Sequence, residues 1–210
     1  SGDGVEVFVH CDDHDIVFNA SIPFDKESIH EKGSMRSHDN GDSMSTMVST
    51  VLSGFEYRYQ KEKYDNLTKY FKENEKKYHY TGFTSKAIYK TQNTGYQNNY
   101  YYLVGNITSL KNYRKYYEPL IQKNNKEFKE GMKKSRNSVN YKANNDVITT
   151  LFSTKKHFTK DNSVGDVIAM SEKIKKLDNM PDKVEYTIQL GGSYINTKNP
   201  FYNEIDPIEG

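Results

Sequence analysis

The stretch SMSTMVSTVLSGFEYRYQKEKYDNLTKYFKENEKKY, residues 43–78, decides the fold of this 210-residue chain. Its apolar side chains recur at steps of three and four residues, which is the spacing of one face of an amphipathic helix. Ser43 is a suitable N-cap residue, and Gly54 is a weak point within the stripe. The pattern predicts one long helix or a helix pair over 43–78. The stripe consists of Met44, Met47, Val48, Val51, Leu52, Phe55 and Tyr59, followed by Leu67, Tyr70, Phe71, Asn74 and Tyr78.

Strand patterns precede and follow this helical stretch. Residues 5–9 and 16–22 are rich in β-branched and aromatic residues, and a polar segment joins them, so they predict a hairpin that ends at Pro23. Residues 84–91 and 100–109 flank a loop that contains glycine and predict a second hairpin. Aromatic residues near the start of the fourth run point to both faces of the sheet, so we expect a central strand there.

The remaining segments complete a mixed pattern of helices and strands. A basic helix is predicted over 110–134, with a break or kink near Pro119. An apolar run over 146–153, a helix from about 161 to 177 and an alternating strand over 184–190 follow. Two further segments have no period. We expect an exposed loop over 25–42 and an extended acidic tail over 196–210.

This order of elements predicts an α+β fold for residues 1–210 as a single domain. The strands pair mainly as hairpins, so an antiparallel sheet packed on one long amphipathic helix is expected rather than a parallel α/β sheet. Such an order is compatible with a cystatin-like or NTF2-like topology, and that analogy implies no function.

Charge is distributed unevenly along the chain, although the net charge is only +2. Residues 1–42 have a net charge of −7, residues 43–160 have +13 and residues 161–210 have −4. A field of one sign attracts partners of the opposite sign, so the positive middle predicts an anionic partner or surface. In the alternative hypothesis the acidic ends fold against the basic middle, and no external partner is needed.

Composition excludes several classes of site. Cys11 is the only cysteine, so an internal disulfide and a cysteine-based zinc cluster are excluded. The sequence has neither a transmembrane span nor the pattern of a signal peptide. It also lacks a glycine-rich phosphate loop and a paired-carboxylate motif, so we predict no catalytic or cofactor-binding residue.

The basic stretch provides the candidate anion-binding residues, which recur at three- and four-residue steps. Tyr113, Tyr116 and Tyr117 lie between them and would suit stacking on bases or sugars. The chain has 26 Lys and four Arg, whereas sequence-specific nucleic-acid modules favour Arg. A diffuse lysine field fits an anionic polymer, a membrane surface or an acidic protein better, and a merely solvated helix is the alternative. The candidates are Lys111, Arg114, Lys115, Lys123, Lys126, Lys129, Lys133, Lys134 and Arg136.

A second cluster lies near the start of the chain. His10, Asp12 and His14, with His38 further on, are residue types that bind zinc or another divalent metal. They would support a metal-dependent hydrolase or nuclease. Their spacing matches no ordered metal motif, so a solvated acidic loop is the competing interpretation.

In composition and texture, being rich in Lys, Asn and Tyr and lacking Trp, the chain resembles uncharacterised exported or lipid-anchored proteins of AT-rich Gram-positive bacteria. This resemblance implies an extracellular or envelope-associated protein, with a cytoplasmic one as the alternative.

The sequence therefore favours a non-enzymatic, extracytoplasmic interaction domain with a Lys-rich surface for an anionic partner. The alternatives are the metal-dependent enzyme and a nucleic-acid-binding accessory protein.

Overall fold

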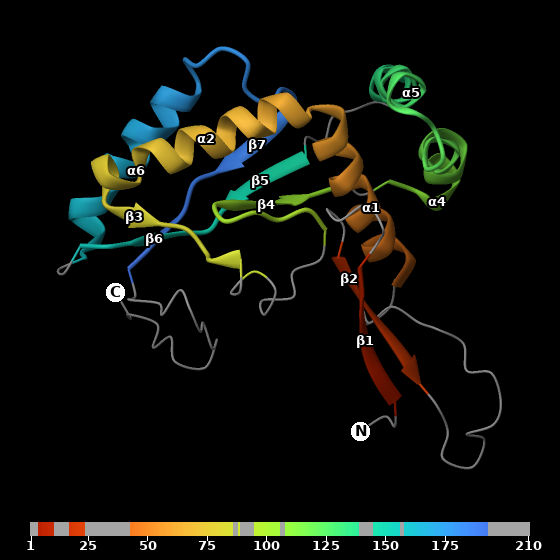
Figure 1. Cartoon of the computed structure of the whole chain (residues 1–210), viewed down its shortest axis with the longest axis horizontal. Coiled ribbons are helices and arrows are strands. Elements are labelled where there is room, and N and C mark those ends of the chain that lie inside the picture. Colours follow the sequence, from red (N-terminus) through yellow and green to blue (C-terminus); the bar gives the residue numbers. More distant parts are fainter. Residues whose placement is uncertain are drawn as a thin grey trace. The chain divides into compact units, whose positions relative to one another are not determined.

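The computed structural model describes residues 4–10, 17–23, 43–85, 88, 95–105, 108–138, 145–155 and 158–192 (Figure 1). Helices and small sheets occur together, and the predicted α+β class is confirmed. The loop expected over 25–42 and the tail expected over 196–210 lie outside the described residues. No helix in the described parts of the chain is both long and apolar enough to cross a membrane.

The chain divides into two compact units, and each is discontinuous in sequence. Unit 1 comprises Ser1–Tyr59, Gln92–Tyr96 and Val104–Asn145. Unit 2 comprises Gln60–Thr91, Gln97–Leu103 and Asp146–Gly210.

Unit 1 contains a hairpin and a helical part. The predicted N-terminal hairpin is confirmed, because β1 pairs antiparallel with β2 from Gly4↔Pro23 to His10↔Val17. The basic segment is helical as predicted, but it is divided into short α, π and 3₁₀ pieces before its long helix. The elements are β1 (Gly4–His10), β2 (Val17–Pro23), α1 (Ser43–Tyr59), α4 (Leu110–Asn112), the π-helical η1 (Tyr113–Tyr117), the 3₁₀-helical η2 (Glu118–Leu120) and α5 (Asn125–Ser138).

The second half of α1 is buried on almost every side, with six consecutive buried residues that end at Tyr57. Small side chains allow backbone to approach it closely. A Cβ on Gly105 would lie 2.2 Å from the carbonyl oxygen of Ser49, whose hydroxyl donates to the Gly105 carbonyl at 2.8 Å. The Ser53 hydroxyl accepts from the Tyr96 amide at 3.0 Å, and the ring of Tyr96 stacks on that of Tyr57. Glycine and serine are therefore packing requirements here.

Unit 2 begins where α1 ends, so residues 43–78 form a helix pair rather than one helix. Gln60 lies between the two helices, and its side-chain amide exchanges two hydrogen bonds with the backbone of Asp182, at 2.9 and 3.0 Å. The elements of unit 2 are α2 (Lys61–Tyr78), β3 (Tyr80–Thr81), β4 (Tyr101–Val104), β5 (Asn145–Thr149), β6 (Leu151–Ser153), α6 (Lys160–Ile174), β7 (Val184–Thr187) and β8 (Leu190–Gly191).

The strands of unit 2 form two three-stranded sheets, in the orders β3-β6-β8 and β4-β5-β7. The β3–β6 pair is antiparallel and the β6–β8 pair is parallel. The expected central position of β4 is wrong for the described strands, because β5 lies in the middle of its sheet. Aromatic residues on both faces of β4 reflect burial of Tyr101 against α2 and half-burial of Tyr102, not a central position.

The strand predicted over 84–91 is also wrong where the structure describes it. The amide of Ile88 donates to the carbonyl of Thr84 at 2.9 Å, which is a helical turn. After β3 the backbone packs against Asn99: a Cβ on Gly82 would lie 2.1 Å from the carbonyl oxygen of Asn99, which accepts from the amide of Phe83 at 2.7 Å. This close backbone approach overrides the β propensity of the residues that follow.

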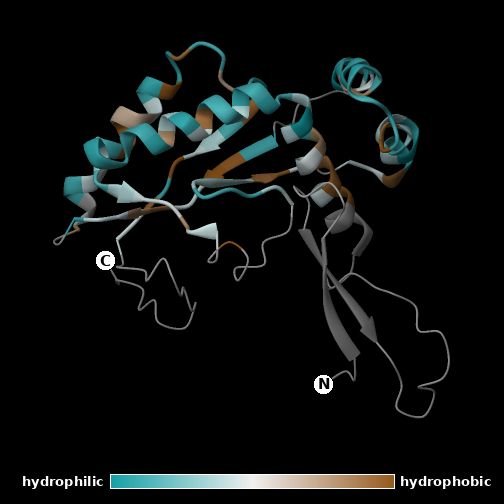
Figure 2. Cartoon of the chain, viewed as in Figure 1, coloured by the Kyte–Doolittle hydropathy of each residue, from teal (hydrophilic) through white to brown (hydrophobic). Residues whose placement is uncertain are grey.

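The core of unit 2 is rich in tyrosine. Tyr64, Phe71 and Tyr101 are fully buried, and hydrophobic residues gather on β4 and β5 whereas most of α2 is hydrophilic (Figure 2). Tyrosine hydroxyls donate to main-chain carbonyls of α2. Tyr101 donates to the carbonyl of Tyr64 at 2.9 Å, and Tyr80 donates to that of Phe71 at 2.5 Å. These bonds satisfy polar groups that would otherwise be costly to bury.

Helix α6 confirms the helix predicted from residue 161 onward. Thr159 caps it, since its hydroxyl accepts from the amide of Asn162 while the side chain of Asn162 accepts from the amide of Thr159. This reciprocal capping box fixes the start of the helix. Met170 and Ile174 on one side of α6 are buried.

Candidate functional site

The candidate anion-binding residues lie on the segment from α4 to α5 in unit 1. The side chain of Ser109 caps α4 by accepting from the amide of Asn112 at 3.2 Å. Asn124 caps α5, because its side chain accepts from the amide of Glu127 at 3.0 Å and donates to the carboxylate of Glu127 at 2.9 Å. The predicted break lies between these caps, where Pro119 belongs to the 3₁₀ turn η2.

An apolar cluster holds this segment against α1. Phe128 and Met132 of α5 are fully buried with Leu52 and Phe55 of α1. The rings of Phe55 and Phe128 meet edge to face, with their centroids 5.2 Å apart. Burial of side chains of this size contributes roughly 1.5–3 kcal/mol each, so the basic segment is a fixed part of unit 1.

Arg58 at the end of α1 fixes the turn before α5, and the sequence pattern did not identify it. Its guanidinium donates to the carbonyl of Lys123 at 3.0 Å and to the side chain of Asn125 at 3.1 Å. It also lies 4.1 Å from the centroid of the Phe128 ring. Its partners are more than 60 residues away in the chain, so local spacing contains no signal for this role.

Arg136 must be removed from the set of candidate anion-binding residues. It is 5% exposed, and its guanidinium lies 3.5 Å from the carboxylate of Glu56, which is 1% exposed. It also lies over the ring of Tyr59, 5.0 Å from the centroid. Arg136 faces the core because it follows Phe128 and Met132 at four-residue steps, and this spacing was visible in the sequence.

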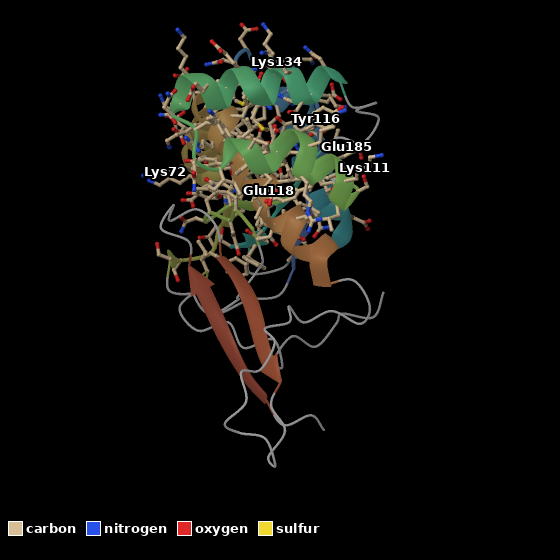
Figure 3. The ribbon with its side chains drawn as sticks, turned by 90° about the vertical axis from the view of Figure 1, so that its right-hand side faces the viewer. Lys72, Lys111, Tyr116, Glu118, Lys134 and Glu185 are labelled. Carbon is tan, nitrogen blue, oxygen red and sulfur yellow. The ribbon has the colours of Figure 1, made fainter. Side chains whose placement is uncertain are left out.

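The other eight candidate bases are all exposed. Glu118, Glu127 and Glu130 are the exposed acids of residues 110–138, which leaves a net charge of +5 on the exposed side chains of this segment. Figure 3 shows α5 and the α4–η1 segment side by side, with Lys111 on α4 and Lys134 on α5. The exposed bases are Lys111, Arg114, Lys115, Lys123, Lys126, Lys129, Lys133 and Lys134.

The three tyrosines of η1 do not form an open stacking platform, contrary to the sequence expectation. Tyr117 is 3% exposed, and Tyr113 and Tyr116 are half-buried against the same apolar cluster. Burial, followed by the nearby charge of Glu118, raises the pKa of Tyr113. The ammonium of Lys115 lies 4.8 Å from the centroid of the Tyr116 ring. The rings support the helix, so only the charged groups are left for a partner.

Two contacts show which side of α5 faces η1 and η2. The hydroxyl of Ser135 donates to the carbonyl of Tyr116 at 3.2 Å, and a Cβ on Gly131 would lie 2.3 Å from the side chain of Leu120. The adjacent side of α5, with Phe128, faces α1.

At about 100° per residue, these contacts also place the charged side chains of α5. Lys126, Lys129 and Lys133 occupy the side of α5 opposite η1, and we call these three residues the α5 lysine stripe. Glu127 and Glu130 lie on the outward side, away from α1, and we call them the outer carboxylates. Glu127 also pairs with Lys123 at 3.8 Å. Lys134 lies between these two acids on the same outward side. The surface is therefore a basic stripe beside a side of mixed charge, not a uniform positive face.

The bases of α4 and η1 form a second group, which we call the η1 cluster: Lys111, Arg114 and Lys115. They share the exposed side of this short segment, because Leu110 and Tyr113 pack against the apolar cluster on the other side. The interhelical contacts therefore separate this group from the α5 lysine stripe by the width of α5.

The candidate metal site is not tested by the structure. Asp12 and His14 lie outside the described residues, as does the side chain of His10 at the end of β1. Within the described ranges, no group of three or more His, Cys, Asp or Glu side chains is placed to hold a metal ion.

Comparisons with known proteins agree with this fold. The model of a family described as "Protein of unknown function (DUF1672)" matches residues 1–209. The chain is similar to the crystal structure, at 1.80 Å resolution, of a DUF1672 family protein from Staphylococcus aureus subsp. aureus Mu50, with 55% sequence identity and a TM-score of 0.78. That similarity covers 97% of this chain and 74% of the other. Among curated proteins, none matches this chain. The resemblance to uncharacterised proteins of Gram-positive bacteria is confirmed to this extent.

Proposed function

Since the chain belongs to the DUF1672 family, we propose that it is a non-enzymatic interaction domain that binds an anionic partner or surface. The binding residues are the exposed bases of the segment from α4 to α5. One observation supports this proposal above the others: eight exposed bases and three exposed acids lie on a segment that an apolar cluster fixes to α1.

Fixed placement matters because it lowers the entropy lost on binding. A lysine on a mobile loop loses backbone and side-chain freedom when it binds, whereas a lysine on α5 loses side-chain freedom alone. Both ends of α5 are held, the first by the cap at Asn124 and the second by the pair between Arg136 and Glu56. The backbone of the binding surface is therefore organised before the partner arrives.

A salt titration tests the proposal. We expect the protein to bind fluorescently labelled dextran sulfate at low ionic strength and to release it at about 1 M salt, where the Debye length falls to about 3 Å. Labelled neutral dextran should not bind. Failure to bind dextran sulfate at low ionic strength would contradict the proposed function.

A matched pair of variants distinguishes this segment from a general charge effect. The test variant replaces four exposed bases by glutamine: Lys111, Lys115, Lys129 and Lys133. The control makes the same change at four exposed lysines of α2 in unit 2: Lys69, Lys72, Lys76 and Lys77. Both variants lose four positive charges. We expect affinity to fall in the test variant and to change little in the control. An equal loss in both would show that net charge, not this surface, is responsible.

We also propose an extracytoplasmic location, on the basis of the sequence resemblance. Fractionation of the producing cells with an antibody against the protein tests it. The expected result is signal in the envelope or medium fraction, and signal confined to the cytosolic fraction would contradict it.

A further inference from the structure

We propose that the anionic partner is a single linear phosphate polymer that lies along the α5 lysine stripe, Lys126, Lys129 and Lys133. This inference rests on the proposed function and narrows it to one class of ligand. It follows from the shape of the charge distribution, which the net charge of the segment does not reveal.

The spacing of the stripe suits a regularly charged chain. At 1.5 Å per residue, Lys126 and Lys129 are separated by about 4.5 Å along the helix axis, and Lys129 and Lys133 by about 6 Å. A ligand with one negative charge in each short repeat can therefore meet all three ammonium groups while it runs parallel to α5. Each ammonium is a flexible point charge with three donors, which suits phosphate oxygens that differ in orientation.

The outward side of α5 attracts an anion less than the stripe does. Glu127 and Glu130 are exposed there, but so is Lys134, and Glu127 pairs with Lys123 at 3.8 Å. This side therefore has no excess of positive charge. A broad polyanion, such as a nucleic-acid duplex or a bilayer surface, would cover this side without gaining attraction from it, whereas a single chain along the stripe faces the three lysines.

The absence of exposed apolar side chains on the stripe argues against a bilayer in a second, independent way. Peripheral helices bind membranes by burying an apolar face below the headgroups, in addition to charge attraction. The exposed large hydrophobic residues of the described chain are Val104, Ile121, Val164 and Ile168. None of them lies on α5. The stripe therefore offers charge without an insertion surface.

The stripe offers side-chain contacts. Lys129 and Lys133 lie beyond the first turn of α5, away from the amides of the helix N-terminus. This arrangement predicts that affinity depends on the number of phosphates that the chain presents to the stripe.

The test measures binding of three probes to the full chain: long-chain inorganic polyphosphate, tripolyphosphate and orthophosphate. We expect the affinity to fall in that order. For the long chain, three phosphate contacts predict a slope of about −2 in a plot of log affinity against log salt. Vesicles of phosphatidylglycerol and phosphatidylcholine serve as the bilayer probe and should bind weakly.

Two variants with equal loss of charge locate the polymer. Lys126→Gln, Lys129→Gln and Lys133→Gln together remove the α5 lysine stripe, and Lys111→Gln, Arg114→Gln and Lys115→Gln together remove the η1 cluster. We expect the first variant to lose polyphosphate affinity by on the order of 100-fold and its salt slope to approach zero. The second should lose less than about tenfold, because its bases act only at a distance. Matching circular dichroism and thermal unfolding would show that both variants are folded.

A third variant tests the role of the outer carboxylates. Glu127→Gln with Glu130→Gln leaves Lys123 and Lys134 without compensating acids on the outward side, so we expect vesicle binding to rise while the order of the three phosphate probes is kept. Unchanged vesicle binding would overturn the preference for a single chain over a wide surface.

The remaining outcomes separate this inference from the proposed function. Two results would overturn the proposed phosphate polymer and leave the anionic-partner proposal standing. One is an equal loss of polyphosphate affinity in the stripe and η1 variants, and the other is binding of vesicles without binding of polyphosphate. Orthophosphate that binds as tightly as the long chain would also overturn it. Failure of polyphosphate, vesicles and dextran sulfate to bind at low ionic strength would overturn both.

Discussion

The cores of unit 1 and unit 2 bury polar groups by different means. In unit 1, two side chains of opposite charge, Glu56 and Arg136, are buried together beside an apolar cluster. In unit 2, neutral tyrosine hydroxyls donate to main-chain carbonyls, as Tyr101 does to Tyr64. A neutral hydroxyl needs one partner, whereas each buried charge needs an opposite charge. Unit 1 therefore depends on keeping an ion pair intact, and unit 2 depends on keeping buried hydroxyls protonated.

The largest expected effect comes from breaking the ion pair between Glu56 and Arg136 in unit 1. Arg136→Met leaves the carboxylate of Glu56 buried without this cation, and we expect a loss of about 3–5 kcal/mol in the free energy of unfolding. Urea unfolding followed by circular dichroism measures it. The double variant Glu56→Leu with Arg136→Met is the control, and it should regain most of the stability. A loss below about 1 kcal/mol in the single variant would refute a dependence on the pair.

The next effect is the pH dependence of stability in unit 2. Burial is the main cause that raises the pKa of Tyr70, Tyr80, Tyr100 and Tyr186 in unit 2. Folding therefore favours the protonated hydroxyl, and this stability is present below the ordinary tyrosine pKa of about 10 and lost as pH rises above it. One fully buried tyrosine costs up to about 1.4 kcal/mol per pH unit, and partial exposure of Tyr186 lowers its share.

Absorbance of tyrosinate at alkaline pH, recorded together with unfolding, measures this dependence. The variant Tyr80→Phe with Tyr186→Phe removes two of the shifted groups, so its loss of stability above pH 10 should be shallower than that of the native chain. Identical slopes for the two proteins would argue against the buried hydroxyls as the cause.

A smaller effect isolates one hydroxyl of unit 2. Tyr80→Phe removes the donor to the carbonyl of Phe71 and keeps the ring, so we expect a loss of about 1 kcal/mol at neutral pH. Thermal unfolding measures it. An unchanged stability would show that this hydrogen bond contributes nothing, and that Tyr80 stabilises unit 2 through its ring alone.

The smallest expected effect lies on the surface of unit 1. Removal of the α5 lysine stripe by glutamine should change the free energy of unfolding by no more than about 0.5 kcal/mol, because its three side chains are exposed. Thermal unfolding at two salt concentrations checks this. A loss much larger than that would mean that the stripe stabilises the fold and is not reserved for a partner.

The helices were predictable because their signals are local. The apolar stripe over 43–78 located α1 and α2, and Pro119 located the break in the basic segment. The junction at Gln60 was not predictable, because its side chain is held by the backbone of Asp182, which is 122 residues further along. The strand expected over 84–91 failed for a similar reason, since the close approach of Gly82 and Asn99 is a tertiary contact.

The candidate surface was predictable as a set of residues but not as a shape. Three- and four-residue spacing identified all the exposed bases of residues 110–138, and the four-residue step from Phe128 through Met132 also contained the signal that Arg136 is buried. The division into a stripe and a cluster required the contacts of Ser135 with Tyr116 and of Gly131 with Leu120, which fix the rotation of α5. Without the orientation of α5 about its axis, the position of the outer carboxylates relative to the other elements could not be assigned.

The interleaving of the two units has a consequence for synthesis of the chain on the ribosome. Glu56 is made 80 residues before Arg136, and all of α2 and β3 is made between them. During that interval α1 has no α5 to cover Phe55, and the carboxylate of Glu56 stays hydrated. Unit 1 therefore closes late, after the first pieces of unit 2 have left the ribosome, and neither unit can be released as an intact fragment by one proteolytic cut.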